Sequence, residues 1–175
     1  MRRLKKLDLQ LMSELIKNCR RSDRDLARAV GSSQPTITRK RARLEKEGLI
    51  ESYTGIPSFV KLGFEIMAFS FYAWRSEANL EALKHEEANA EKLSAFLSKN
   101  KNIIFTSKGR GFGMERMMIS VHTSYADYVR LMKAVSKEWG DRLSQTNSFI
   151  VSLQEDAVGT KLNFEHFADH LSKAL

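Results

Sequence analysis

The stretch GSSQPTITRKRARLEKEGLIESYTG (residues 31–55) carries five cationic residues within eight positions, namely Arg39, Lys40, Arg41, Arg43 and Lys46. Ser33 is a good N-cap residue, and Pro35 suits a first helical turn because its missing N–H has no partner there. Gly48 supplies the left-handed residue that commonly ends a helix. The stretch therefore predicts one helix between Ser33 and Gly48 that carries a dense positive charge.

This predicted helix has an apolar side and a cationic side. At 100° per residue, Ile37 and Leu44 lie within about 20° of each other, so they mark the side that packs. The opposite side carries Thr36, Arg39, Arg43 and Lys46. Arginine can contact guanine or phosphate when a helix is presented to a groove. A solvated charged face, partly balanced by Glu45 and Glu47, is the alternative explanation.

Two shorter helices are predicted before the cationic one. Residues 7–16 carry apolar side chains at helical spacing, and a second helix over residues 23–30 follows the capping residue Ser22 and ends at Gly31. Two helices joined by a short turn containing glycine form a helix-turn-helix. Residues 49–54 are β-prone, so we expect a small strand there and hence a winged helix-turn-helix domain over residues 1–56.

The charge of the chain is concentrated in this part of the sequence. Residues 1–60 carry 14 Lys or Arg against 7 Asp or Glu, whereas residues 61–175 carry 15 against 14. Such asymmetry is expected when one domain binds a polyanion and the other does not. We therefore predict that the N-terminal domain binds double-stranded DNA.

The DNA contacts expected from this arrangement fall into two groups. Those expected on the side facing the major groove are Gln34, Thr36, Thr38, Arg39 and Arg43. Those expected at the phosphates are Arg20, Arg21, Lys40 and Lys46, with Ser22 acting through its backbone N–H and Ser33 at the helix start. In a dimer, two such helices would enter successive major grooves of a pseudo-palindromic site.

Residues 7–55 resemble the Lrp/AsnC family of transcription regulators, which typically read LD..D..IL..L, S...LA..VG.S...V.RR and LE..G.I..Y. The matching positions are Leu7, Asp8, Leu15, Ser22, Leu26, Ala27, Val30, Gly31, Ser33, Arg39, Leu44, Glu45, Gly48, Ile50 and Tyr53. Arg41 departs from the pattern because the family usually buries a valine there. Either its alkyl stem lies along the core, or the helix is slightly rotated.

The remaining two-thirds of the chain predict an α+β domain. Strands are expected at residues 63–74, 102–108, 114–123 and 148–153, and helices at 76–99, 124–140 and 163–175. The order βαββαβ is the ferredoxin-like plan. We assign residues 57–63 to a linker and residues 64–175, including the C-terminal helix, to this domain.

The first of these strands has apolar residues on both faces, including Met67, Phe69 and Phe71 on one of them. A strand that is buried on both sides needs a cover on both sides. Helices can cover one face and a second subunit the other. The family resemblance likewise implies that the sheets of two subunits pack face to face, in a dimer or a higher oligomer.

The turn GRGFGME (residues 109–115) is the candidate effector site. In the family this turn lies near the site of an amino-acid effector, which implies Gly109, Gly111, Gly113 and Glu115 here. The aspartate that the family often has in this turn is missing. A phosphate-binding glycine loop would need a helix to follow, whereas MERMMISV is strand-like, so we predict a hairpin.

Other classes of protein find little support in the sequence. A single cysteine, Cys19, excludes an internal disulfide framework and fits a cytoplasmic location, and no apolar stretch is long enough to span a bilayer. His166 and His170 have a metal-chelating spacing but no third ligand except Asp169, so we predict no metal and no cofactor. His122, alone in a strand, is expected in the core or at an interface.

The sequence therefore predicts a DNA-binding transcription regulator, not an enzyme, that acts as a dimer or higher oligomer. A small effector such as an amino acid is a possible ligand. Two alternatives stay open. One is a ligand-sensing or protein-interaction module without DNA binding. The other is a siroheme-decarboxylase-like enzyme, because those enzymes resemble the same two-domain architecture but have no need of a cationic third helix.

Overall fold

The computed structural model describes residues 4–75, 86–154 and 162–173, and the chain forms two compact units. The first unit contains residues 1–56 together with residues 160–175, and the second contains residues 57–159.

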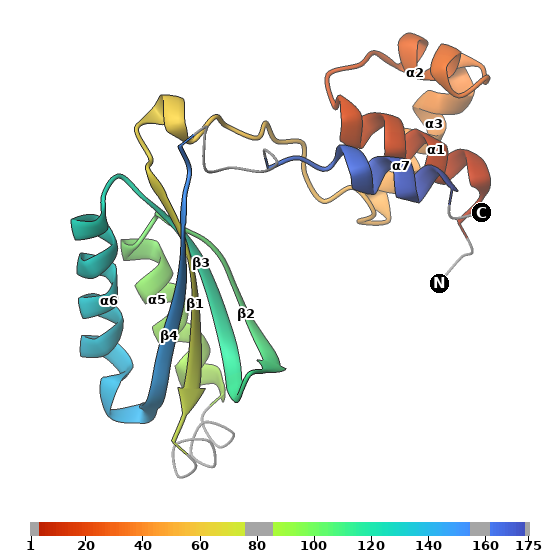
Figure 1. The fold of residues 1–175 in the computed structure, drawn as a ribbon. Coiled ribbons are helices and arrows are strands. Elements are labelled where there is room, and N and C mark those ends of the chain that lie inside the picture. The colour runs from red at the N-terminus through yellow and green to blue at the C-terminus, as the bar shows by residue number, and fades with distance from the viewer. Residues whose placement is uncertain (1–3, 76–85, 155–161, 174–175) are drawn as a thin grey trace. The chain divides into compact units, whose positions relative to one another are not determined.

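The first unit is built on three helices, α1 (Lys6–Lys17), α2 (Asp23–Ala29) and α3 (Gln34–Lys46) (Figure 1). Their shared core is formed by Leu11, Leu15, Leu26, Ala27, Ile37 and Leu44, all of them buried. Ser22 caps α2 by accepting the backbone N–H of Asp25, and Gly31 adopts the left-handed conformation between α2 and α3. The predicted helix-turn-helix and its inward-facing residues are confirmed.

The strand expected at residues 49–54 is not formed. The backbone N–H groups of Leu49 and Ile50 both bond to the carbonyl of Leu44, at 2.9 and 3.2 Å, so the chain folds back on the end of α3. Residues 51–58 adopt neither helix nor strand. The prediction was wrong because β-prone residues form a strand only where a second strand pairs with them, and none pairs with this segment in the described part of the chain.

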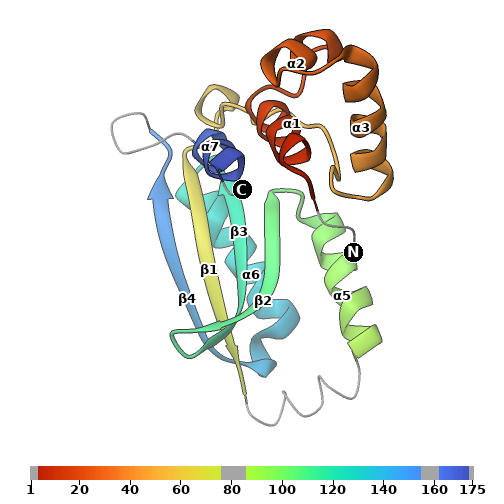
Figure 2. The ribbon, with the colours of Figure 1, turned by 90° about the vertical axis from the view of Figure 1, so that its right-hand side faces the viewer.

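The C-terminal helix α7 (Glu165–Lys173) belongs to the first unit, not to the ferredoxin-like domain to which we assigned it. It lies beside α1 (Figure 2). Ala168 is fully buried, and Asp169 Oδ1 lies 2.7 Å from Nζ of Lys17 on α1. The amphipathic pattern located the helix, but such a pattern does not say which element covers its apolar side.

The second unit is a four-stranded antiparallel sheet with two helices. Its elements are β1 (Ile66–Trp74), α5 (Glu86–Lys99), β2 (Ile103–Gly111), β3 (Met114–His122), α6 (Tyr125–Trp139) and β4 (Leu143–Ser152), with short 3-10 turns η1 (Val60–Leu62) and η2 (Gly140–Arg142). The strand order β2-β3-β1-β4 confirms the ferredoxin-like plan. Both α5 and α6 lie on the same face of the sheet (Figure 1).

The helix-covered face holds the core of the second unit, formed by Tyr72, Phe96, Met118, Leu131 and Val135. Phe96 is the buried residue of α5, whereas Leu93 and Leu97 of the same helix are half-buried. The start of the helix expected at residues 76–99 lies outside the described residues up to residue 85.

The other face of the sheet is apolar and partly exposed. Strand register places Phe69 opposite Ile119 of β3 and Phe149 of β4. Phe149 is 67% exposed and Phe105 is 49% exposed. Because α5 and α6 both lie on the opposite face, neither of them covers this apolar surface, which we call the open face.

Candidate nucleic-acid interface

Helix α3 presents part of its cationic side to solvent. Gln34, Arg39 and Lys46 are exposed, and the first of these opens the helix. Arg39 Nε donates to the carbonyl of Pro35 at 3.3 Å, which holds the guanidinium along the helix. Thr36 is half-buried, with its hydroxyl 2.8 Å from that of Ser33. These side chains form the outward surface of α3.

Two other cations of α3 are bonded to α1 instead. Asp8 is fully buried, and its Oδ1 lies 2.5 Å from Lys40 Nζ while its Oδ2 lies 2.8 Å from Arg43 Nη2. The same carboxylate accepts the backbone N–H of Lys5 at 3.0 Å. Arg43 was expected beside Arg39 on the groove side and Lys40 at the phosphates, but both side chains bond to the protein itself.

The Asp8 carboxylate is charged at all physiological pH values. Burial by itself would raise the pKa of Asp8, but the hydrogen bonds from Lys40, from the Lys5 backbone and from Arg43 lower it to about 2. Hydrogen bonding to Asp8 in turn raises the pKa of Arg43. A buried ion triad of this kind is costly to break, because removal of one partner leaves an uncompensated charge.

Arg41, the residue that departs from the family pattern, is held by an ion-pair cluster. Its guanidinium lies 3.2 Å from Asp23 of α2 and 3.3 Å from Glu45 of α3, and its carbon Cζ lies 4.8 Å from the centre of the Tyr53 ring. The Tyr53 hydroxyl donates to Glu45 at 2.6 Å. Arg41 therefore joins α2, α3 and the segment after α3, where a valine would join them by apolar packing.

Some of the remaining candidates around α2 bond to the protein, and others are exposed to solvent. Arg21 is bonded to Glu14 of α1, and Thr38 donates to Asp23 at 2.7 Å. Arg20 is exposed, and so is Arg24, which the sequence analysis did not select. Within the described residues, the cations of this region without an ion pair are Arg20, Arg24, Arg39 and Lys46. The position of Arg24 in the run CRRSDR was the sequence signal for it.

The glycine turn of the second unit is a hairpin, as predicted. Gly111 pairs with Met114, and β3 follows at once. Phe112 at the tip is 96% exposed with φ of 54°, and open space surrounds Gly109, Gly111 and Gly113. Glu115 accepts the backbone N–H of Trp74 at 3.1 Å. The four effector candidates thus lie on or beside a projecting turn.

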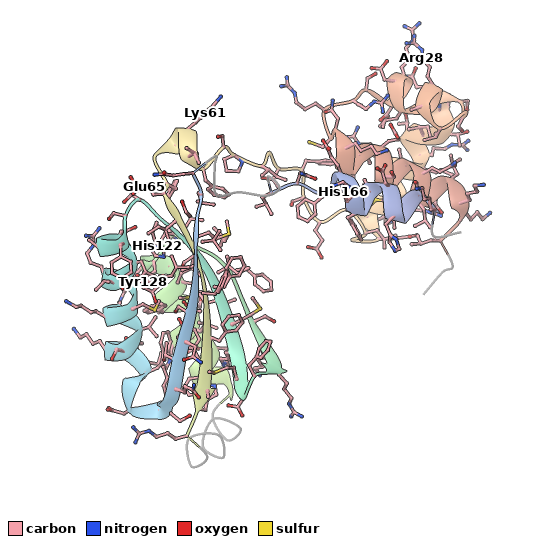
Figure 3. The ribbon with its side chains drawn as sticks, in the orientation of Figure 1. Arg28, Lys61, Glu65, His122, Tyr128 and His166 are labelled. Atoms are coloured by element: carbon pink, nitrogen blue, oxygen red, sulfur yellow. The ribbon has the colours of Figure 1, made fainter. Side chains whose placement is uncertain are left out.

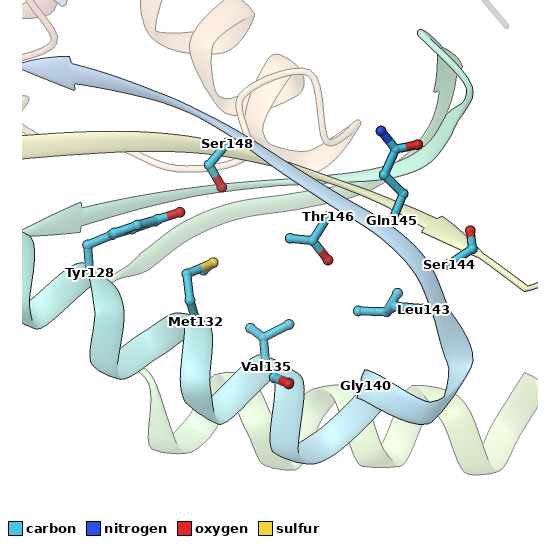
Figure 4. Close-up of a pocket in the computed structure, with 10 residues that line it drawn as sticks. Tyr128, Met132, Val135, Gly140, Leu143, Ser144, Gln145, Thr146 and Ser148 are labelled. Atoms are coloured by element: carbon cyan, nitrogen blue, oxygen red, sulfur yellow. The ribbon is translucent and has the colours of Figure 1, made fainter.

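A cavity of about 410 Å³ lies elsewhere in the second unit, between α6 and β4 (Figure 4). Tyr128, Met132 and Val135 line it from α6, and Ser144, Thr146 and Ser148 line it from β4. Leu143, Gln145, Ser136 and Gly140 complete the lining, which contains no acidic or basic side chain. Nothing in the sequence pattern located this cavity.

His122 is in the core of the second unit, as one of the two expectations had it. Its Nε2 lies 2.8 Å from Ser120 Oγ and its Nδ1 lies 3.3 Å from Asp127 Oδ2, and its ring packs edge-on against Tyr128 (Figure 3). Burial lowers the pKa of His122, although Asp127 opposes that shift. Ser120 is fully buried, so this serine–histidine–aspartate order offers no nucleophile to a substrate.

The described ranges contain neither a metal-binding cluster nor a membrane-spanning helix. No group of three or more His, Cys, Asp or Glu side chains there is arranged to hold a metal ion. His166 and His170 are exposed on α7, with Asp169 between them paired to Lys17. Across residues 4–75, 86–154 and 162–173, no helix is long and apolar enough to cross a bilayer.

Residues 4–51 match the family model described as winged helix-turn-helix DNA-binding. An uncharacterized HTH-type transcriptional regulator of Pyrococcus abyssi is 35% identical over 91 residues, which cover 52% of this chain and 61% of that protein. The leucine-responsive regulatory protein of Rhizobium meliloti is 31% identical over 85 residues, or 47% of this chain and 54% of that protein. The chain thus spans little more than half the length of these curated relatives.

The whole fold is also similar to solved structures. A transcriptional regulator from Neisseria meningitidis, solved as a complex with L-Met, superposes with a TM-score of 0.69 at 19% identity, covering 94% of this chain and 99% of that one. At this identity the likeness concerns the fold. The N-terminal part is thus similar in sequence to HTH-type transcriptional regulators, and the chain shares the two-domain fold of the solved regulator.

Proposed function

We propose that this protein is a sequence-specific DNA-binding transcription regulator that acts as a dimer or a dimer-based assembly. The observation that carries this proposal is the outward surface of α3. There Arg39 and Lys46 are exposed and make no ion pair with any described residue, while Ile37 and Leu44 are buried on the opposite side. The match to a winged helix-turn-helix DNA-binding family supports it. Under this proposal the chain is not an enzyme.

The hydrogen bonds and ion pairs of each candidate residue indicate which role we expect of it. Gln34, Thr36 and Arg39 are proposed to reach base edges, because their side chains lie on the exposed side of α3. Arg20, Arg24 and Lys46 are proposed to meet phosphates, together with the backbone N–H of Ser22. The remaining candidates, Arg21, Ser33, Thr38, Lys40 and Arg43, bond to protein groups and are proposed to orient the helices.

The dimer is proposed to form through the open face of the sheet. Phe105 and Phe149 are large apolar side chains in exposed positions, and Phe69, Phe71 and Ile119 lie between them in the strand register. Exposed apolar patches of this kind mark interaction sites in soluble proteins. A two-fold axis through this face would relate the helix-turn-helix units of the two protomers, as a pseudo-palindromic DNA site requires.

A small effector, such as an amino acid, is proposed to bind the ferredoxin-like domain. The solved complex of the similarly folded Neisseria regulator with L-Met supports an amino acid as the first ligand to test. The turn that contains Gly109, Gly111, Gly113 and Glu115 is the proposed position. Addition of L-methionine should change the DNA affinity of the wild-type protein, but leave it unchanged in a Gly111→Val variant.

The DNA-binding proposal is tested by selecting genomic fragments that the purified protein retains. The best fragment is then titrated by fluorescence anisotropy against a scrambled duplex of equal length at several salt concentrations. We expect tighter binding to the selected fragment and affinities for both duplexes that fall with salt. A protein that bound no duplex with salt-dependent affinity would instead support a ligand-sensing or protein-interaction module without DNA binding.

A siroheme-decarboxylase-like enzyme remains the second alternative, because its architecture resembles this fold. The names of the relatives favour a regulator. Incubation of the protein with siroheme separates the two proposals, since an enzyme of that class would acquire the absorbance of the bound tetrapyrrole. We expect no such absorbance.

A further inference from the structure

A single buried carboxylate lies behind the outward surface of α3. Asp8 is fully buried in α1, yet it is the partner of two cations that come from a different helix. Lys40 and Arg43 belong to consecutive turns of α3, so the two bonds hold that helix at two points along its axis. Rotation of α3 about its own axis would break both bonds.

The same bonds decide which cations DNA can attract. Lys40 and Arg43 are only 18% and 27% exposed, because their charged ends point to Asp8. Arg39 and Lys46, from the same helix, are exposed and make no ion pair within the described residues. The five cations of α3 therefore contribute unequally. Lys40 and Arg43 share the single negative charge of Asp8, with Glu47 also 3.8 Å from Arg43, and Arg41 is paired with Asp23 and Glu45.

We propose that Asp8 is a positioning and specificity-determining residue: it fixes the orientation of α3 and withholds Lys40 and Arg43 from the DNA phosphates. The proposal rests on the proposed DNA-binding function. Attraction to phosphate adds affinity for every sequence alike, whereas contacts to base edges discriminate between sequences. Withholding two cations of the recognition helix from the phosphates thus lowers non-specific binding without loss of the base contacts of Arg39.

The size of the effect follows from counterion release. Each phosphate that a cation neutralises on duplex DNA contributes about 0.9 to the slope of log affinity against log salt. If Asp8 withholds two cations, their release in Asp8→Asn should steepen that slope by up to about 1.8. Affinity for every duplex at low salt should rise with the added phosphate contacts. The ratio of specific to non-specific affinity should fall by about tenfold or more, because α3 loses the orientation that its base contacts need.

The experiment compares salt slopes of full-length variants on a selected fragment and on a scrambled duplex. Asp8→Asn keeps the shape of the side chain and removes its charge. Glu51→Gln is the matched control, because Glu51 is exposed and its loss changes the net charge by the same amount. We expect a steeper slope and lost discrimination in Asp8→Asn alone. Equal slopes in the two variants would overturn the proposal.

A second pair of variants keeps the test valid if Asp8→Asn does not fold. Arg43→Met and Lys46→Met each remove one cation from α3 and leave the carboxylate paired with Lys40. We expect Lys46→Met to flatten the salt slope by about 1, because Lys46 is exposed and proposed to meet phosphate, and Arg43→Met to leave it unchanged. A flattened slope in Arg43→Met would show that Arg43 reaches phosphate, which contradicts the proposal. If the wild-type protein bound no DNA, the proposed function itself would fail instead.

Discussion

The two units of the molecule differ in which side chains they bury and which they expose. In the first unit the six core residues of the helix-turn-helix are buried, and several charges are paired across helices, such as the buried Asp8 with Lys40 and Arg43. In the second unit the polar residues Ser70, Ser120 and His122 are fully buried, whereas Phe105 and Phe149 are exposed on the open face.

This difference indicates what each unit lacks. Within the described residues, the first unit carries cations without an ion pair on the outward surface of α3, and these need an anionic partner. The second unit has an apolar face without a cover, which needs an apolar partner. The DNA and the second subunit of the proposed function meet these two requirements. Substitutions in the two units should therefore show their effects in different assays.

The largest effect is expected in the closed core of the first unit. Leu44→Ala should destabilise the helix-turn-helix unit by about 2–5 kcal/mol, because Leu44 is fully buried among helices and its removal leaves a cavity. Chemical denaturation followed by circular dichroism measures this. The same substitution should not change the dimerisation constant. A protein that dissociated into monomers without unfolding would contradict the claim that this core acts on stability and not on assembly.

A substitution on the open face should act on assembly. Phe149→Glu should weaken dimerisation by about 100-fold or more, since it places a charge in an apolar interface on both protomers. Sedimentation equilibrium measures the constant. Ile150→Glu is the control, because residue 150 is opposite Ala68 and points to the other face. If both variants remained dimeric, the open face would not be the interface.

A smaller loss is expected at the outward surface of α3. Arg39→Ala should cost about 1–3 kcal/mol of affinity for the selected DNA site and relax its sequence preference, if the guanidinium reads a base. Anisotropy titrations against single-base variants of the site measure this cost. Arg28→Ala removes an equal charge from α2, where Arg28 projects from the first unit (Figure 3), and should not relax that preference.

The smallest effect concerns the buried polar residues of the second unit. The pKa of His122 is lowered from the usual 6.5 because the ring is buried. The unfolded chain therefore takes up a proton more readily than the folded one, so the stability present above pH 6.5 decreases as the pH falls below that value. Thermal unfolding between pH 7.5 and pH 5 should show this decrease, and His122→Gln should diminish it. An unchanged pH dependence in that variant would contradict the assignment.

Local signals predicted the first unit well and the relations between elements less well. Ser22, Gly31 and the spacing of Ile37 and Leu44 located the helices, because capping and helical periodicity act within a few residues. The bonds of Lys40 and Arg43 to Asp8 could not be predicted, since they join positions more than thirty residues apart. The helical wheel described the direction of each Cα–Cβ bond, but a long side chain can reach back to a buried acid.

In the second unit the alternation of apolar residues predicted the strands and their order, and the plan βαββαβ then predicted the sheet. The cover of α7 by α1 and the cavity beside β4 depend on surfaces that meet only in three dimensions. The missing strand at residues 49–54 also shows that local sequence does not say which elements contact each other. Its residues favour a strand, but a strand also requires a paired neighbour.

The measurement that tests the central claim most directly is the salt-dependent affinity of the full-length wild-type protein for its selected DNA fragment, set beside that of Arg39→Ala. We predict that affinity falls steeply with salt and that Arg39→Ala loses about 1–3 kcal/mol on the selected fragment but little on the scrambled duplex. Equal affinities of the two proteins for both duplexes would contradict the claim that the outward surface of α3 reads DNA.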